Sequence, residues 1–347
     1  MKKPNWLGFG IIPGILILFS FISCSRNVKE EEKAIHDTTR LTLNTINAQI
    51  SADKANPLLY NQRAVIYTLD RQFDNALKDV NKAISLSPKN PLFYVTLSEI
   101  YLIMGQTRNC EESLNHALLL DPGNKDAILK LAKLHLVVKE YQATFEDVKK
   151  ALALDPVNPQ AYFIRAIALL EKGDTIMAVD DLKKAVDQDQ AYYEGYMELG
   201  ELYTIKKDKI AENYLKNAIN IRPKSKEALY MLGMFYQDNG QYKKAIETYA
   251  ILSVADTAFR NAPYNTGYIY LVYLKDFKLA EKFFTDALKR DPGYVEAYFN
   301  RGYASELSGD YANAYSDYQK VLKLKTNYQK AIDGLNRLDK LKQKKAN

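Results

Sequence analysis

Apolar and small residues recur along most of this chain in a pattern that fits pairs of short helices. In the first half of several repeats, an aromatic residue is followed four positions later by a small residue and three positions after that by another aromatic residue, as in Tyr60, Ala64 and Tyr67. Spacings of three and four residues place these side chains on one face of a helix. A short turn with Gly or Asp follows, then a second apolar segment that usually stops at a proline, which cannot continue a helix.

The closing positions of these units repeat with a period of about 34 residues. They lie 33 to 35 residues apart, at Pro88, Pro122, Pro156, Gln190, Pro223, Thr257, Pro292 and Thr326. The small position of the first helix repeats with them, as Ala64, Ser98, Ala132, Ala166, Gly200, Gly233, Gly267 and Gly302. Small residues let two helices approach closely, and aromatic residues fill the space beside them. Repetition at this period predicts eight stacked helix pairs rather than a domain with one central core.

This signature is similar to that of the tetratricopeptide repeat (TPR) family across residues 57–326. The resemblance implies an all-α fold, a TPR superhelix of about eight helix-turn-helix repeats with capping helices at its N- and C-terminal ends. The fourth, sixth and eighth units lack the closing proline. The fifth unit is one residue shorter and the seventh one residue longer than the period of 34. The local turns of these units are therefore less well defined by the pattern than the fold is. The family also implies a concave groove, lined by the first helices, that binds a protein or an extended peptide.

Residues 1–23 have the pattern of a bacterial lipoprotein signal peptide. Lys2 and Lys3 precede an uncharged apolar run, and Cys24 follows a small residue, as at the end of a secretory signal. The arrangement resembles a lipobox, which implies lipidation of Cys24 and a body in the bacterial cell envelope. Ser25 resembles the residue that directs lipoproteins to the outer membrane, facing the periplasm. An uncleaved membrane anchor and plain secretion are the alternatives.

Two flanking segments are expected to complete the array. Residues 24–56 combine the lipid tether with an N-terminal helix that carries apolar residues at near-helical spacing. Residues 327–347 are predicted to form a basic, amphipathic capping helix, because a terminal repeat needs a polar outer face.

Three units carry an arginine just before the small position and an aspartate 16 residues later. The pairs are Arg63 with Asp79, Arg165 with Asp181, and Arg301 with Asp317. We predict that each pair forms a bidentate ion pair between the two helices of its unit. Of the five units without this arginine, one keeps the aspartate, as Asp147.

The composition argues against most catalytic and metal chemistry. The 347 residues include 2 Cys and 3 His, too few for a zinc, iron–sulfur or multi-disulfide framework. His135 lies at an aromatic position of the repeat and Cys110 at a small one, so both are expected to pack in the core. No glycine-rich phosphate loop or nucleophile elbow is present in the sequence. We therefore expect no enzymatic activity, cofactor or metal.

The net charge of +6 is concentrated at the C-terminus. Residues 320–347 hold nine Lys and Arg against two Asp, which leaves residues 24–319 with a net charge of −3. Nucleic-acid binding needs a basic stripe along the working surface. No nucleic-acid partner is expected.

The groove-facing stripe implied by the family is rich in aromatic residues and methionine in its C-terminal half. The candidate partner-binding residues are Phe163, Met197, Glu201, Tyr230, Met234, Tyr264, Tyr268, Phe299 and Tyr303. Tyrosine, phenylalanine and methionine often anchor partners. We expect a membrane-tethered scaffold or adaptor for a protein or peptide partner in envelope assembly, secretion or proteolysis. A glycan-binding module that uses exposed tyrosines is one alternative, and an enzyme is another.

Overall fold

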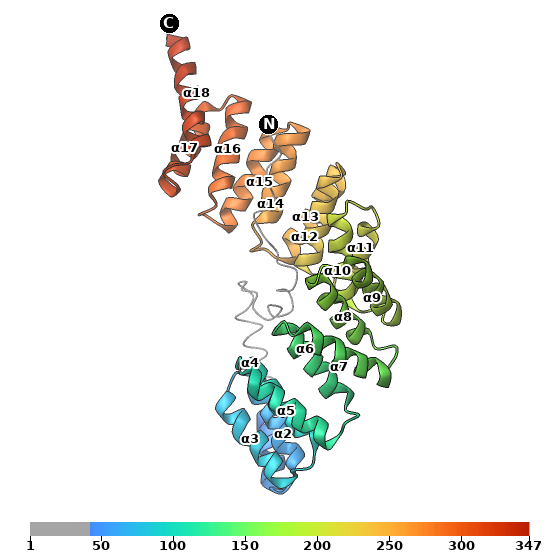
Figure 1. Ribbon diagram of the computed structural model, residues 1–347. Helices are drawn as coiled ribbons and strands as arrows, with labels where there is room; N and C mark the ends of the chain where they lie inside the picture. Colours follow the sequence, from blue (N-terminus) through green and yellow to red (C-terminus); the bar gives the residue numbers. More distant parts are fainter. Residues whose placement is uncertain (1–41, 347) are drawn as a thin grey trace. The chain divides into compact units, whose positions relative to one another are not determined.

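The structure, a computed structural model, describes residues 42–346 of the chain. Every regular element in that range is helical (Figure 1). The all-α fold predicted from the periodicity is therefore confirmed. The signal peptide, Cys24 and most of the tether lie outside the described residues, so the predictions made for them are not addressed by the structure.

Eight helix pairs follow one another along the chain. The first helices are α2 (Pro57–Leu69), α4 (Pro91–Ile103), α6 (Lys125–Val137), α8 (Pro159–Glu171), α10 (Tyr193–Ile205), α12 (Lys226–Asp238), α14 (Asn261–Ile269) with η2 (Tyr270–Leu274), and α16 (Val295–Ser308). The second helices are α3 (Phe73–Leu86), α5 (Thr107–Leu120), α7 (Tyr141–Leu154), α9 (Thr175–Gln188), α11 (Ala211–Ile221), α13 (Tyr242–Ala255), α15 (Phe277–Arg290) and α17 (Tyr311–Leu324). A helix over residues 42–52 precedes the first pair, and α18 (Gln329–Ala346) follows the last.

The chain divides into two compact units, here called unit 1 and unit 2. Unit 1 ends at Gly195 and unit 2 begins at Tyr196. Each unit has buried clusters of its own. In unit 1, Ala64, Ala76 and Phe93 are fully buried in one cluster. In unit 2, Phe235 and Tyr249 belong to a second buried apolar cluster.

Small residues are required where the two helices of a pair cross. A Cβ atom added to Gly233 would lie 2.4 Å from Cε1 of Tyr249, whose ring is fully buried. At Gly267 the same atom would lie 3.0 Å from the ring of Phe284. In these two pairs an aromatic ring of the second helix occupies the space that a side chain on the first helix would need, and at Gly200 the Leu215 side chain does so, 2.6 Å from an added Cβ.

The turn between the two helices contains one residue with positive φ in every pair. These residues are Arg71, Gly105, Lys139, Gly173, Lys207, Gly240, Lys275 and Gly309. A left-handed residue ends the first helix and reverses the chain. Glycine adopts this conformation without strain, whereas arginine or lysine there costs about 1 kcal/mol.

The fifth and seventh helix pairs, whose repeats differ in length from the others, also differ in local structure. The seventh pair, whose repeat is one residue longer than the period of 34, contains the π-helical turn η2 (Tyr270–Leu274) at the end of its first helix. A π-turn accommodates one extra residue inside a helix. The repeat of the fifth pair is one residue shorter than the period of 34. Its second helix, α11, has 11 residues, whereas the other second helices have 14.

The arginines and aspartates of the three predicted pairs face each other across the two helices. Nε and Nη2 of Arg63 donate to Oδ2 and Oδ1 of Asp79 at 2.5 and 2.8 Å. Arg165 and Arg301 hold their aspartates in the same way, at 2.6 to 2.8 Å. These pairs are less exposed than typical surface ion pairs, because the three aspartates are only 3 to 5% exposed. Loss of the arginine would therefore leave a buried carboxylate without its cation.

Two of these arginines, Arg63 and Arg301, also bind the helix that precedes their pair. Nη1 of Arg301 donates to Oγ1 of Thr285 on α15 at 3.0 Å, and Nη1 of Arg63 donates to Oδ1 of Asn47 at 2.6 Å. Thr285 and Asn47 each lie 16 residues before their arginine. The helix over residues 42–52 therefore takes the place of a second helix and caps the array.

His135 takes over the arginine's role in the third pair. Its Nδ1 lies 2.7 Å from Oδ2 of Asp147, to which it can donate a hydrogen bond, and Lys150 donates to Oδ1 at 3.0 Å. His135 is 8% and Asp147 is 3% exposed. The contact between His135 and Asp147 thus explains why the histidine is buried. It also explains why this pair keeps the aspartate without the arginine.

Candidate functional site

One face of the first helices carries most of the side chains predicted to bind a partner. We call the first-helix face the second, fifth, ninth and thirteenth positions of each first helix, counted from Pro57 on α2 and from the equivalent residues of the other pairs. Their spacing of three or four residues places them on one side of the helix. The character of this face differs between the two units.

In unit 1 the first-helix face is aliphatic and exposed on α2 and α4. On α2, Leu58, Val65 and Leu69 are 46, 38 and 76% exposed. On α4, Leu92 and Ile103 are 45 and 53% exposed. Every large apolar side chain exposed on these two helices lies on this face. Exposed apolar groups gathered in this way are typical of interaction sites.

Asn61 lies between Leu58 and Val65 on the same face of α2. It is 6% exposed, and its Oδ1 is the only buried side-chain oxygen or nitrogen without a hydrogen bond between residues 42 and 346. A buried acceptor that lacks a donor costs about 1–3 kcal/mol. The apolar face of unit 1 thus contains an unsatisfied polar atom.

In unit 2 the first-helix face is aromatic, methionine-rich and acidic. Seven of the nine predicted partner-binding residues lie there and are partly exposed: Met197, Glu201, Tyr230, Met234, Tyr268, Phe299 and Tyr303. Several rings lie against one another, as in the parallel contact of Phe299 and Tyr303 with centroids 6.3 Å apart. This face offers apolar surface together with carboxylates.

Phe163 and Tyr264, the other two predicted binding residues, are buried. Phe163 is 8% exposed and packs edge-on against Tyr192 at 5.5 Å. Tyr264 is 9% exposed and packs against Tyr294 at 4.8 Å. Both therefore belong to the packing between helices, and the prediction that they present a surface to a partner is corrected.

Two tyrosines of this face take part in the packing of unit 2. The hydroxyl of Tyr264 on α14 accepts a hydrogen bond from Nδ2 of Asn300 on α16 at 2.9 Å. Tyr230 on α12 packs edge-on against Phe259, with the ring centroids 5.2 Å apart. Burial raises the pKa of both hydroxyl groups, so they remain protonated. These two tyrosines therefore have a structural role in unit 2.

The sequence prediction omitted Leu69 and Ile103 from the first-helix face. Leu69 lies one turn beyond Val65, and Ile103 one turn beyond Glu99. Extending the 3.6-residue periodicity by that turn would have found both. They are the two most exposed apolar residues of the face on α2 and α4.

Models of the tetratricopeptide repeat family match residues 58–90, 92–124, 214–247 and 269–330. These matches fall on helix pairs of both units. The chain is a tetratricopeptide repeat protein. TPR repeats generally mediate protein–protein interaction, and TPR proteins are typically scaffolds without enzymatic activity.

Several solved structures are similar to this TPR protein. The C-terminal part of a TPR repeat-containing protein from Cytophaga hutchinsonii is 18% identical, with 79% of this chain and 98% of that chain covered and a TM-score of 0.49. A tetratricopeptide repeat protein from Parabacteroides merdae is 17% identical, with 72% and 99% covered and a TM-score of 0.46. The MamA protein is 22% identical, with 48% and 92% covered and a TM-score of 0.41. The search of curated proteins found no match.

Two carboxylates on α10 of this TPR protein lack a compensating cation. Burial and the neighbouring Glu201 raise the pKa of Glu198 to about 7, and burial raises the pKa of Glu201. Neither carboxylate makes a hydrogen bond or an ion pair with any other described residue. By contrast, Lys216 lowers the pKa of the Glu212 carboxyl group through a hydrogen bond.

Glu198 is expected to make the stability of the TPR protein depend on pH. Its folded pKa of about 7 lies above the ordinary value of 4.5, so the folded chain binds this proton more tightly than the unfolded chain. The resulting stability is present below pH 4.5 and is lost as the pH rises to 7. In urea denaturation, the advantage of Glu198→Gln over the wild type should widen by about 2 kcal/mol from pH 5 to pH 8. Exposed Glu247→Gln is the control, and an equal response of both variants would contradict the assignment.

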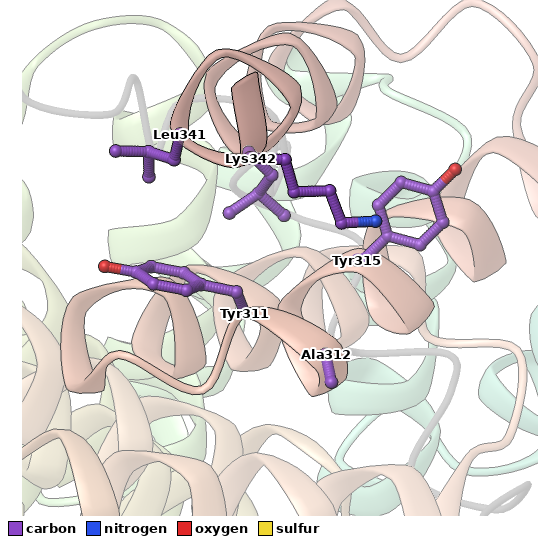
Figure 2. Close-up of a pocket in the computed structure, with 6 residues that line it drawn as sticks. Tyr311, Ala312, Tyr315, Leu341 and Lys342 are labelled. Atoms are coloured by element: carbon purple, nitrogen blue, oxygen red, sulfur yellow. The ribbon is translucent and has the colours of Figure 1, made fainter. Parts of the chain in front are cut away.

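A hollow of about 430 Å³ lies between α17 and α18 (Figure 2). Its lining residues are Tyr311, Ala312, Tyr315, Leu338, Leu341 and Lys342. The ammonium group of Lys342 lies over the Tyr315 ring, 5.3 Å from its centroid. One lysine among apolar and tyrosine side chains gives no acid–base pair for catalysis.

Two further features are absent from residues 42–346. No group of three or more His, Cys, Asp or Glu residues in that range could hold a metal ion. None of the helices described there combines the length and the apolar character needed to cross a bilayer.

Proposed function

We propose that this TPR protein is a scaffold that binds an extended segment of a partner protein on its first-helix faces. The proposal includes a lipid on Cys24 that tethers the chain to the outer membrane of a bacterial envelope, facing the periplasm. It places the protein in envelope assembly, secretion or proteolysis. Cys24 and the signal peptide are outside the described residues, so the tether rests on the sequence resemblance.

The observation that carries the proposal is the exposed aliphatic face of α2 and α4. Fully burying one leucine or isoleucine side chain contributes about 1.5–3 kcal/mol. Leu69 and Ile103 alone are 76 and 53% exposed. A partner that covers this face would gain that contribution. An extended chain can place successive apolar side chains along such a face.

The arrangement of the rings favours a protein partner over a glycan. A glycan site would need open ring faces with polar neighbours, whereas several rings of unit 2 stack on one another. Tyr242 and Tyr273 stack at 4.4 Å, and Tyr270 and Phe283 stack at 5.5 Å. Little flat surface is left on these pairs for a sugar ring to stack on.

The test is photo-crosslinking from chosen positions of the full chain in its native cells. A benzoyl-phenylalanine residue is placed at Leu69, Ile103 or Tyr303 on the first-helix face. The matched controls are apolar positions off this face, Leu119, Ile176 and Val254, which are 76, 84 and 82% exposed. The three face positions should give the same crosslinked partner, and the controls should not. Equal crosslinking from the control positions would place the binding surface elsewhere.

A further inference from the structure

The charges of unit 2 are distributed unevenly between its surfaces. Residues 196–319 hold 16 Lys and Arg and 16 Asp and Glu, so this stretch is neutral as a whole. Yet every charged residue on its first-helix face is acidic: Glu201, Glu227, Asp238 and Glu296. Glu198 adds a fifth carboxylate directly beside this face. The lysines and arginines of the stretch lie at other positions.

The carboxylates on α10 stand out from the other shielded acids of unit 2. Glu306, whose side chain is 11% exposed, receives two hydrogen bonds from Arg337, both at 2.7 Å, and one from Tyr318 at 2.6 Å. Asp317 is held by Arg301 in the same bidentate way. Glu198 and Glu201 are also partly buried but have no such donor in the part of the chain that the structure describes. Desolvated carboxylates without a cation are unfavourable unless a ligand supplies one.

The neighbours of these carboxylates suit the stem of a long cationic side chain. Met197 lies on the same face of α10, and it packs against the same buried cluster as Tyr230 and Met231 of α12. Methionine adapts its shape to flexible aliphatic stems. Tyrosine rings attract cations over their faces. An acidic segment would instead be repelled along the whole face.

We infer that the first-helix face of unit 2 binds an extended partner segment that alternates basic and apolar side chains, with a lysine or arginine against Glu198 and Glu201. This inference rests on the proposed function and names the chemistry of its partner. The apolar side chains lie against Tyr268, Phe299 and Tyr303. Packed helices lie about 8–10 Å apart, so the face from α10 to α16 spans roughly 30 Å. An extended chain of about nine residues covers that length.

The test measures binding of defined peptides to the full chain. The probes are ten-residue, end-capped peptides that alternate Leu with Lys, Gln or Glu, followed by fluorescence anisotropy at pH 8. The Lys peptide should bind at least tenfold more tightly than the Gln peptide, and the Glu peptide more weakly than either. The double variant Glu198→Gln/Glu201→Gln should weaken the Lys peptide at least fivefold.

The matched control removes the same amount of charge elsewhere in unit 2. Glu247→Gln/Asp339→Asn changes two exposed acids, on α13 and α18, that lie off the first-helix face. It should leave the affinity within twofold of the wild type. Equal weakening by both double variants would show general charge attraction and overturn the inference, as would equal binding of the Lys and Glu peptides.

The two proposals can fail separately. If Leu69 and Ile103 crosslink the native partner but the double variant Glu198→Gln/Glu201→Gln binds the Lys peptide normally, the scaffold function stands and the cationic inference falls. If the face positions give no specific crosslink and the peptides do not discriminate, both fall. The variant is expected to fold, because removal of the carboxylate at residue 198 should stabilise the chain above pH 7.

Discussion

Gly233→Leu is expected to destabilise unit 2 by about 4 kcal/mol. A Cβ at this position would lie 2.4 Å from Cε1 and 2.8 Å from Cδ1 of Tyr249, a separation that real side chains do not show. The Tyr249 ring is fully buried and its hydroxyl is bound to Gln237 and Asn265, so it cannot move aside without losing those hydrogen bonds. Overpacking commonly costs 1–3 kcal/mol, and more where the neighbour is fixed. Leucine is a good helix former, so backbone propensity would not explain the loss.

Chemical denaturation followed by circular dichroism measures this effect. Gly240→Ala is the matched control, because Gly240 has a φ of 72° and no atom within 4 Å of an added Cβ. It should cost only about 1 kcal/mol of backbone strain. In a double-mutant cycle, Tyr249→Ala should recover part of the loss in the Gly233→Leu background. A Gly233→Leu variant as stable as Gly240→Ala would contradict the role given to the small position.

His135→Ala is expected to cost about 3 kcal/mol in unit 1. The variant leaves the 3% exposed carboxylate of Asp147 with Lys150 as its remaining donor. The Lys150 side chain is 62% exposed and therefore less able to compensate a buried charge. Leaving a buried group without its hydrogen-bond partner costs about 1–3 kcal/mol, and more where the group is charged. Asn115→Ala is the control, because Asn115 is exposed and such changes usually stay within about 0.5 kcal/mol.

A rescue experiment separates this explanation from simple loss of packing. Leu131 occupies the position that arginine holds in three other pairs, 16 residues before Asp147. The double variant Leu131→Arg/His135→Tyr rebuilds the arrangement of Arg63 and Asp79. Its denaturation midpoint should return to near that of the wild type. A midpoint as low as that of His135→Ala would show that the Asp147 carboxylate is not the cause.

Much of the fold could be predicted from the sequence because it depends on contacts that repeat. The small position must leave room for a bulky side chain of the second helix, so Gly200, Gly233 and Gly267 occur at a nearly fixed spacing. The arginine–aspartate pairs also follow one spacing, and this is why Arg165 and Asp181 could be matched without a structure. The spacing of such residues in the sequence follows from which side chains pack together, so it can be read without a structure.

The burial of individual face residues could not be predicted in the same way. Helical periodicity gives the direction of a side chain but not how far neighbouring helices cover it. Tyr264 was expected to be open, yet the structure places Asn300 and Tyr294 against it. The raised pKa of Glu198 depends on burial and on its neighbour Glu201, and the residue lies one position off the stripe. Both features depend on how successive pairs stack, which the repeat signature leaves open.

The three hydrogen bonds of the Arg301 guanidinium affect how the helix array unfolds. Its guanidinium binds Thr285 on α15, and it binds Asp317 on α17 from its own position on α16. Fraying of the last pair must therefore break a contact with the pair before it. Arg165, whose bonds to Asp181 lie within one pair, makes no such contact among the described residues. Hydrogen exchange should accordingly follow larger cooperative blocks near residue 301 than near residue 165, so that the array opens in segments of unequal length rather than one repeat at a time.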